Sequence, residues 1–145
     1  MHFIAQRGKL DMFFLSGVQF DGEGNLNLHV IGDPDAPDRR FPGGYGSGLL
    51  AYTAKKLMLF RTEHSTRTFV PKVDYVSAAL KTDPTISRAK QQIWLFTPKA
   101  IFRWDEGRQR YALLSYHRGA TPEEVQAATG FELLIPPDVA ETLSG

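Results

Sequence analysis

The sequence predicts a mixed fold of the α/β or α+β class. Two short apolar runs, residues 10–15 and 56–61, are bounded by glycine or polar residues, which is typical of strands that are buried on both faces. Residues 49–54 between them have helical character. The turn residues 105–108 stand between two further apolar segments and predict a β-hairpin in the last third of the chain.

Composition excludes several classes of protein. The chain has 145 residues, which fits a single domain over residues 1–145, and it contains no cysteine. Disulfides, a thiolate nucleophile, iron–sulfur clusters and cysteine-based zinc sites are therefore excluded. A formal charge of +1 gives no general attraction to nucleic acid, so we expect no such partner. The apolar runs are too short for a membrane helix and the first residues lack the features of a signal peptide, so we expect a cytoplasmic protein without a membrane partner.

Turn signals divide the first forty residues. A short helical turn is expected at residues 2–8, before the strand at 10–15. After the turn-forming residues 21–25, apolar and polar residues alternate over 26–30, which favours a strand. Residues 33–40 contain two prolines and three aspartates, and we expect a surface loop that neither pairs in a sheet nor packs in the core.

Residues 42–48 are rich in glycine, with Gly43, Gly44, Gly46 and Gly48. Glycine lets backbone N–H groups approach a ligand closely, which suits a phosphate or an oxyanion. The segment does not follow a clear strand, so it is not the dinucleotide-binding fingerprint, and it lacks the Gly-x-Ser-x-Gly elbow of a serine nucleophile. Two interpretations remain open: a tight turn, or a loop that holds a ligand.

Prolines shape the second half of the chain. Residues 69–76 are apolar, but Pro71 excludes them from the interior of a sheet. Residues 81–91 are polar and irregular. The apolar segments 93–97 and 100–104 flank Pro98 and fit one interrupted strand or two short ones, and 111–116 is the return strand of the hairpin.

The clearest local pattern lies at residues 121–130. Thr121 is a typical helix N-cap, Pro122 fits the first helical position and Glu124 completes a capping box. Gly130 is expected to end the helix.

Glu63 and His64 follow the predicted strand at 56–61. In open parallel sheets, ligands bind beyond the carboxyl ends of the strands, so a polar pair at this point is well placed to bind one. The alternative is a solvated loop with an ordinary surface histidine. The four histidines, at positions 2, 29, 64 and 117, show no spacing typical of metal ligands, and we expect no metal site.

Several segments, in the same order along the chain, resemble the family I coenzyme A transferases. The most specific is 115–133, which begins Ser-Tyr-His-Arg-Gly-Ala-Thr-Pro-Glu-Glu-Val; the least specific is the glycine segment 42–48. The others are 10–27, 97–105 and 67–77, which reads Arg-Thr-Phe-Val-Pro-Lys-Val-Asp-Tyr-Val-Ser. Together they cover nearly the whole chain and are similar to the C-terminal half of a β subunit, as in glutaconate or 3-oxoacid CoA-transferase.

The resemblance implies a fuller fold: α/β class, with an open, largely parallel sheet, flanking helices and the C-terminal β-hairpin. It also implies chemistry in which CoA moves between carboxylic acids through a thioester on a glutamate, while backbone donors stabilise the oxyanion. The family's glutamate lies in a Ser-Glu-Asn-Gly motif in the first half of the β subunit, and this sequence has no such motif. We therefore nominate no catalytic residue, expect the family's N-terminal half to be missing, and expect no CoA transfer by the isolated chain.

Three functions are compatible with the missing motif. The first is a CoA-transferase-like subunit or fragment that binds an acyl-CoA thioester and completes an active site with partner chains. The second is a subunit of the glutamate-lacking branch, which hydrates or hydrolyses ring-containing CoA thioesters and which residues 64–70 also resemble. The third is a non-catalytic assembly or ligand-binding domain. A nucleotide or sugar-phosphate binding domain is a rival from another class, since one fold supports many functions.

We expect the ligand at the carboxyl edge of the sheet. If the strands at 10–15 and 56–61 are parallel, the residues that follow them share that edge, and the glycine segment lies between them in sequence. The predicted substrate-binding residues are Gln19, Asn25, Gly43, Gly44, Gly46, Gly48 and His64. The expected substrate is a coenzyme A thioester, with no tightly bound cofactor.

The expected assembly is a homo-oligomer or a heteromer with a CoA-transferase α-like subunit. The resemblance implies pairing of this kind. The chain also carries many large apolar residues for its size, including Trp94, Phe96, Phe102 and Trp104. A large patch of such residues left exposed would favour aggregation.

Overall fold

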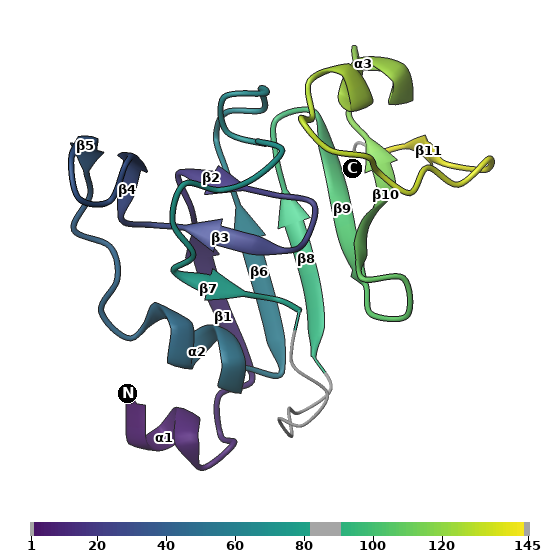
Figure 1. Ribbon diagram of the computed structural model, residues 1–145. Helices are drawn as coiled ribbons and strands as arrows, with labels where there is room; N and C mark the ends of the chain where they lie inside the picture. Colours follow the sequence, from purple (N-terminus) through teal and green to yellow (C-terminus); the bar gives the residue numbers. More distant parts are fainter. Residues whose placement is uncertain (1, 82–90, 144–145) are drawn as a thin grey trace.

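A six-stranded sheet forms the centre of the protein (Figure 1). The computed structural model describes residues 2–81 and 91–143. β9 runs antiparallel to both of its neighbours and the other pairings are parallel, so five of the six strands point the same way. In spatial order the strands are β1 (Met12–Ser16), β6 (Lys56–Phe60), β8 (Gln92–Phe96), β9 (Ala100–Asp105), β10 (Arg110–Tyr116) and β11 (Ala140–Glu141). The predicted α/β class, the largely parallel sheet and the hairpin, which is β9–β10, are confirmed.

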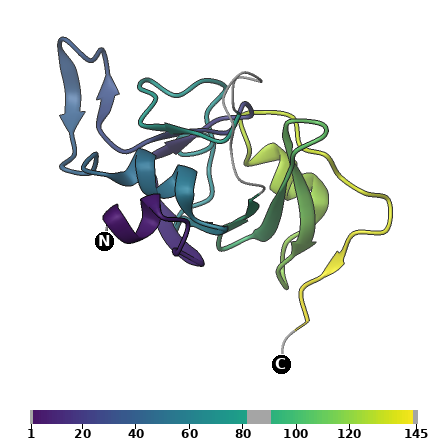
Figure 2. The ribbon, with the colours of Figure 1, turned by 90° about the horizontal axis from the view of Figure 1, so that it is seen from below.

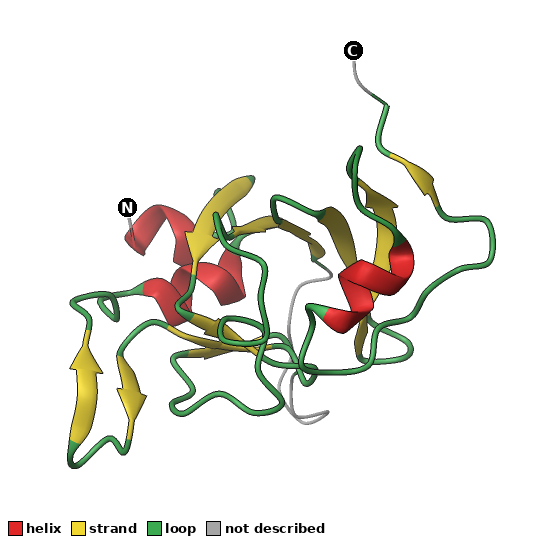
Figure 3. Ribbon diagram, turned by 90° about the horizontal axis from the view of Figure 1, so that it is seen from above, coloured by secondary structure: helices red, strands yellow, loops and turns green. Residues whose placement is uncertain are grey.

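A second layer lies on one side of this sheet, as Figures 2 and 3 show. It contains a three-stranded sheet of β2 (Gln19–Phe20), β3 (Asn25–Asn27) and β7 (Ala78–Ala79), together with α2 (Ser47–Thr53) and α3 (Pro122–Ala127). The short helix α1 (His2–Gln6) contacts α2, and a ribbon of β4 (Val30–Gly32) and β5 (Pro37–Arg40) projects beyond the layer. Within the described residues, no helix is long and apolar enough to cross a membrane.

The core lies between the two layers. Alternate residues of the large sheet point inward because successive side chains of a strand face opposite ways. The inward set includes Leu15, Leu57, Leu59, Ile93, Leu95, Phe102 and Trp104, all buried. Phe20, Leu26 and Phe69 from the second layer pack against them, and the rings of Phe20 and Phe69 stack at 5.5 Å.

The opposite side of the large sheet is uncovered. No described helix or strand packs on it (Figure 3). We call it the outer face, and it carries Met12, Phe14, Met58, Phe60, Trp94, Phe96 and Ile101. Phe14 is 62% exposed and Phe60 is 41% exposed. The prediction that the strands at 10–15 and 56–61 are buried on both faces is therefore wrong, because the described chain supplies one covering layer and not two.

Two expectations for the segment 26–40 are also wrong. The alternating residues 26–30 do not form one strand, because the Asn27 side chain accepts hydrogen bonds from the backbone N–H groups of His29 and Val30 and turns the chain there. Residues 37–40, expected to stay unpaired, form β5 against β4. Pro37 is tolerated because it is the first residue of an exposed edge strand.

The local signals of the second half are mostly confirmed. Thr121 caps α3, and the reciprocal hydrogen bonds with Glu124 complete the capping box. Pro98 separates two strands, β8 and β9, rather than interrupting one. Phe102 and Trp104, expected to contribute to an exposed patch, lie in the core instead, because they point to the inner side of β9. Most of the irregular stretch 81–91 lies outside the described residues.

Candidate functional site

The carboxyl ends of β1 and β6 open into a crevice. Ser16 and Phe60 are paired at these ends, and the chain leaves the two strands through Gly17 and Arg61. The crevice has a volume of about 190 Å³ and is lined by Ser16, Gly17, Val18, Leu28, Phe41, Pro42, Gly43 and Arg61. Ligands bind at this edge in open parallel sheets, so the crevice is the candidate site.

The glycine segment contributes to the crevice through Gly43. The other three glycines have structural reasons to be glycine. A Cβ on Gly44 would lie 1.9 Å from the ring of His29, and Gly46 begins α2 with a φ of 74° that side chains disfavour. A Cβ on Gly48 would lie 3.3 Å from the Ser77 carbonyl oxygen. Of the two interpretations left open for this segment, the tight turn explains most of its glycines.

Gln19 is buried and its amide is used inside the protein. Its Nε2 donates to Asp74 at 2.8 Å, and its Oε1 accepts from Asn27 Nδ2 at 2.7 Å and from the Asp74 N–H at 3.0 Å. This network joins β2 and β3 to the segment that precedes β7. Protein partners thus engage both the nitrogen and the oxygen of the Gln19 amide, and Gln19 does not line the crevice.

Asn25 closes the turn that begins at Asp21. The Asp21 carboxylate is buried and accepts hydrogen bonds from the N–H and the Nδ2 of Asn25, both at 3.0 Å. It also accepts from the N–H groups of Glu23 and Val73. Four donors compensate the burial of this charge, so Asn25 has a structural role in the turn.

His64 is buried rather than exposed at the edge of the sheet. Its Nδ1 lies 2.9 Å from Thr97 Oγ1 and its Nε2 lies 3.0 Å from Thr129 Oγ1. Its ring packs on Phe69 at 4.5 Å and on Phe102 at 5.7 Å. Burial, with a smaller contribution from Lys99, lowers the pKa of His64 from 6.5 to about 4, so the ring is neutral at neutral pH.

Threonine hydroxyls occupy both ring nitrogens of His64. Thr129 Oγ1 donates to the Val125 carbonyl oxygen at 2.8 Å, so it accepts from His64 Nε2–H. Thr97 Oγ1 lies 2.9 Å from Nδ1 but also 3.0 Å from the Ala100 carbonyl oxygen, and its single proton can serve only one of these two acceptors. Both ring nitrogens of His64 therefore have a threonine hydroxyl within hydrogen-bonding distance, and neither is open to a ligand.

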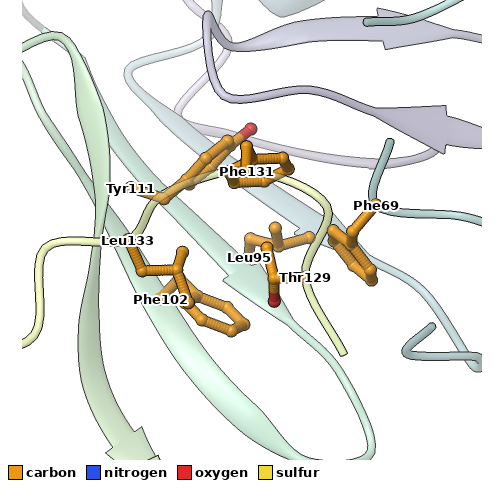
Figure 4. A pocket seen from close by; sticks show the side chains of 7 residues that line it. All are labelled: Phe69, Leu95, Phe102, Tyr111, Thr129, Phe131 and Leu133. Atoms are coloured by element: carbon orange, nitrogen blue, oxygen red, sulfur yellow. The ribbon is translucent and has the colours of Figure 1, made fainter. Parts of the chain in front are cut away.

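A tightly packed cluster lies beside His64 (Figure 4). Phe69, Phe102 and Thr129, which contact the histidine, are part of it. The space between the side chains of this cluster cannot admit a water molecule. The cluster consists of Phe69, Leu95, Phe102, Tyr111, Thr129, Phe131 and Leu133. This region is core, not a second binding site.

Arg61 is the charged residue of the crevice, and sequence reasoning did not nominate it. The nearest carboxylate is Glu63, whose Oε2 lies 3.8 Å from Arg61 Nη2, beyond hydrogen-bonding distance. Glu63 instead accepts hydrogen bonds from Ser65 and Arg67, which lower the pKa of its carboxyl. A single charged residue at the end of an apolar run was the signal that could have identified Arg61.

The structure therefore brings few of the predicted site residues together. Gly43 lines the crevice, whereas Gln19, Asn25 and His64 have their polar groups engaged within the protein. A role of these residues in binding stays a prediction. In the described part of the chain, no three histidine, aspartate or glutamate side chains cluster in a way that could hold a metal ion.

Comparisons with known proteins agree with the resemblance. The family model described as coenzyme A transferase matches residues 1–128. The chain is 31% identical to the B subunit of 3-oxoadipate CoA-transferase from Pseudomonas knackmussii in an alignment of 143 residues that covers 94% of this chain and 55% of the relative. It is 33% identical to the B subunit of glutaconate CoA-transferase from Acidaminococcus fermentans in an alignment of 128 residues that covers 83% of this chain and 47% of the relative.

A solved structure extends the likeness to three dimensions. The decarboxylase AibA/AibB matches with a TM-score of 0.82 and 25% identity, covering 98% of this chain and 55% of that one. The chain thus spans about half the length of the curated relatives it matches. Because the family model matches most of the sequence and two relatives exceed 30% identity over most of it, this chain belongs to the coenzyme A transferase family.

Proposed function

We propose that this chain is part of a B-type CoA-transferase-like subunit, which binds the acyl end of a coenzyme A thioester and completes an active site with a partner chain. The observation that carries the proposal is the crevice at the carboxyl ends of β1 and β6 in a member of this family. Backbone groups of Gly17 and Gly43 border it, and glycine allows a ligand to approach the backbone closely.

The small volume of the crevice supports a binding site that is shared between two polypeptides. Its volume of about 190 Å³ is below the roughly 300–1,000 Å³ of pockets that enclose a whole small ligand. A short acyl group fits such a space, whereas the much larger coenzyme A moiety does not. The rest of the thioester would lie against a second polypeptide.

The uncovered outer face supports the proposal that this chain assembles with a partner chain of the same family. Parallel sheets occur almost only with both faces covered, and here one face is apolar and bare within the described residues. The two relatives are each named as the B subunit of their enzyme, and the structural neighbour AibA/AibB has two named components. We therefore propose a heteromer with an α-like subunit, in the cytoplasm where acyl-CoA is available.

The isolated chain is not expected to transfer CoA. It lacks the Ser-Glu-Asn-Gly motif that the resemblance associates with the covalent thioester. Its glutamates do not line the crevice, so none is a candidate nucleophile on this chain. No described contact favours the ring-opening hydrolase or the purely structural alternative.

Nuclear magnetic resonance tests the proposal on the chain as it exists. A ¹⁵N-labelled sample is titrated with butyryl-CoA into the millimolar range, because half of a site binds weakly. We expect the largest amide shifts at Gly17, Val18, Gly43 and Arg61. The larger side chain of Val18→Phe should fill the crevice and remove these shifts, whereas Val76→Phe, at an exposed position away from it, should leave them. Shifts confined to other residues, or none at all, would contradict the proposal.

A further inference from the structure

A serine and a histidine from distant parts of the chain meet beside the crevice. Ser77 Oγ lies 2.7 Å from His29 Nδ1, and the two residues are 48 positions apart in sequence. Both side chains are half-buried, so a ligand can reach them. Leu28, which lines the crevice, donates its backbone N–H to the same serine oxygen at 2.9 Å. The pair therefore stands at the wall of the crevice.

The imidazole of His29 is the acceptor for the serine proton. The Leu28 N–H occupies one lone pair of the Ser77 oxygen, and a serine hydroxyl has a single proton. Among the described residues, His29 Nδ1 is the acceptor within hydrogen-bonding distance of that hydroxyl. A neutral imidazole with its proton on Nε2 accepts at Nδ1. A hydroxyl and a base about 2.6–3.2 Å apart are the arrangement that activates a serine for nucleophilic attack.

The surroundings of His64 show what a purely structural contact looks like. Each threonine beside that buried histidine also has a carbonyl oxygen within reach of its hydroxyl, that of Ala100 or that of Val125. Ser77 has no such carbonyl among the described residues, and its imidazole partner is half-buried rather than enclosed in the core. The contact between Ser77 and His29 is thus the accessible one of the two.

The ring of His29 is held in place on several sides. A Cβ on Gly44 would lie 1.9 Å from Nε2, so glycine lets the backbone pass directly against the ring. The ring of Tyr75 lies 5.1 Å from it, tilted by 59°. The backbone of His29 donates to Asn27 Oδ1 at 3.0 Å and accepts from the Phe41 N–H at 2.7 Å. The base is therefore oriented toward the serine before a ligand arrives, which favours reaction.

We infer that Ser77 is a nucleophile and His29 its general base, which gives the chain an esterase activity toward thioesters and activated esters of short carboxylic acids. Ser77 Oγ attacks the acyl carbon and forms an ester bond, the bond from that carbon to the leaving group breaks, and the hydroxyl proton passes through Nδ1 to the departing thiolate or alkoxide. Water then attacks the ester, Nδ1 passes its proton to the serine oxygen, and the free acid leaves. This activity goes beyond the proposed function, because it needs no residue of a partner chain.

A simple ester tests the pair without coenzyme A. The chain is incubated with p-nitrophenyl butyrate, and mass spectrometry of its peptides locates any butyryl group. We expect one butyryl group on Ser77 early in the reaction, followed by continued release of p-nitrophenolate as water frees the serine. Butyryl-CoA should place a butyryl group on the same serine and release free coenzyme A.

Variants separate the two roles. Ser77→Ala should abolish acylation at this position. His29→Gln can keep a hydrogen bond to the serine but cannot act as a base, and it should slow acylation roughly a hundredfold. His117→Gln is the matched control, because His117 Nδ1 also lies 3.0 Å from a hydroxyl, that of Thr142, and this variant should leave the rate unchanged. Circular dichroism checks that each variant is folded.

The possible results distinguish this inference from the proposed function. Butyryl groups on lysines alone, or an unchanged rate in His29→Gln, would overturn the inference, and peptide mapping of the unaltered chain decides this even where a variant does not fold. If p-nitrophenyl butyrate acylates Ser77 but butyryl-CoA neither acylates the chain nor shifts its amides, the pair stands and the proposed function fails. If butyryl-CoA shifts the crevice amides and neither compound acylates Ser77, the inference fails and the proposed function stands.

Discussion

His64 shows how burial determines the chemistry of a single residue. Its position after β6 resembled that of a ligand-binding side chain, yet its two nitrogens lie within hydrogen-bonding distance of Thr97 and Thr129 inside the protein. These hydrogen bonds connect the carboxyl ends of β6 and β8 to the segment after α3. The neutral imidazole therefore ties elements of the fold together.

Stability should depend on pH through His64. The unfolded state takes up a proton as the pH falls below 6.5, whereas the folded state does so only near pH 4, because burial lowers the pKa of His64 to about 4. Stability is thus lost as the pH falls from about 6.5 to about 4. Urea unfolding should give a free energy of unfolding about 2 kcal/mol lower at pH ~5 than at pH ~7.5.

Histidine variants isolate this effect. His64→Gln should flatten the dependence of unfolding free energy on pH over this range, whatever its effect on stability at neutral pH. His117→Gln, at a half-buried histidine outside the apolar core, is the control and should retain the slope. An unchanged slope in His64→Gln would show that other groups cause the dependence.

At the scale of elements, α3 is a short helix held by its ends and by one buried residue. It spans six residues, which is too few to be stable alone. Val125 is buried against the core, and the capping box satisfies two backbone donors at the first turn. The helix therefore depends on its cap and on its contact with the sheet (Figure 1).

Removing the cap should lower stability measurably. Thr121→Ala deletes the hydroxyl that accepts from the Glu124 N–H at 3.2 Å, and we expect a loss of about 1 kcal/mol in unfolding free energy. Urea unfolding monitored by circular dichroism measures it. Thr66→Ala, at an exposed threonine in a loop, should change stability by less than about 0.5 kcal/mol. Equal effects of both variants would argue against a stabilising cap.

At the scale of the whole molecule, the exposed apolar outer face is the main feature that a stable monomer would not be expected to have. Its large apolar residues lie next to one another across the paired strands, with Phe60 beside Phe96 in one row and Phe14, Met58 and Trp94 in the next. Apolar rows of this kind are normally covered by another polypeptide layer.

The purified chain should therefore associate. Light scattering at high concentration is expected to give a mass above the 16.2 kDa of one chain. The double variant Phe14→Glu, Phe60→Glu places two charges on the outer face and should scatter as a monomer with unchanged circular dichroism. Phe3→Glu, on the exposed side of α1, is the control and should not change the mass. A clean monomer of the unaltered chain would show that the outer face needs no cover.

The sequence by itself determined the features that depend on local chemistry. The capping box at Thr121, the hairpin turn at 105–108 and the break at Pro98 follow from backbone geometry within a few residues, so they could be predicted. The order of longer motifs along the chain predicted the family, and the family in turn predicted the largely parallel sheet.

The tertiary structure decided the features that depend on distant neighbours. Gly44 is glycine because the ring of His29, brought there by folding, occupies its side-chain space, while His64 is buried because Thr97 and Thr129 converge on it. The apolar run of β1 specifies a strand. It does not specify which face of that strand is buried, because burial depends on layers built from other parts of the polypeptide. Arg61 became a candidate in the same way, because a charge at the end of a strand gains meaning only when the crevice around it is known.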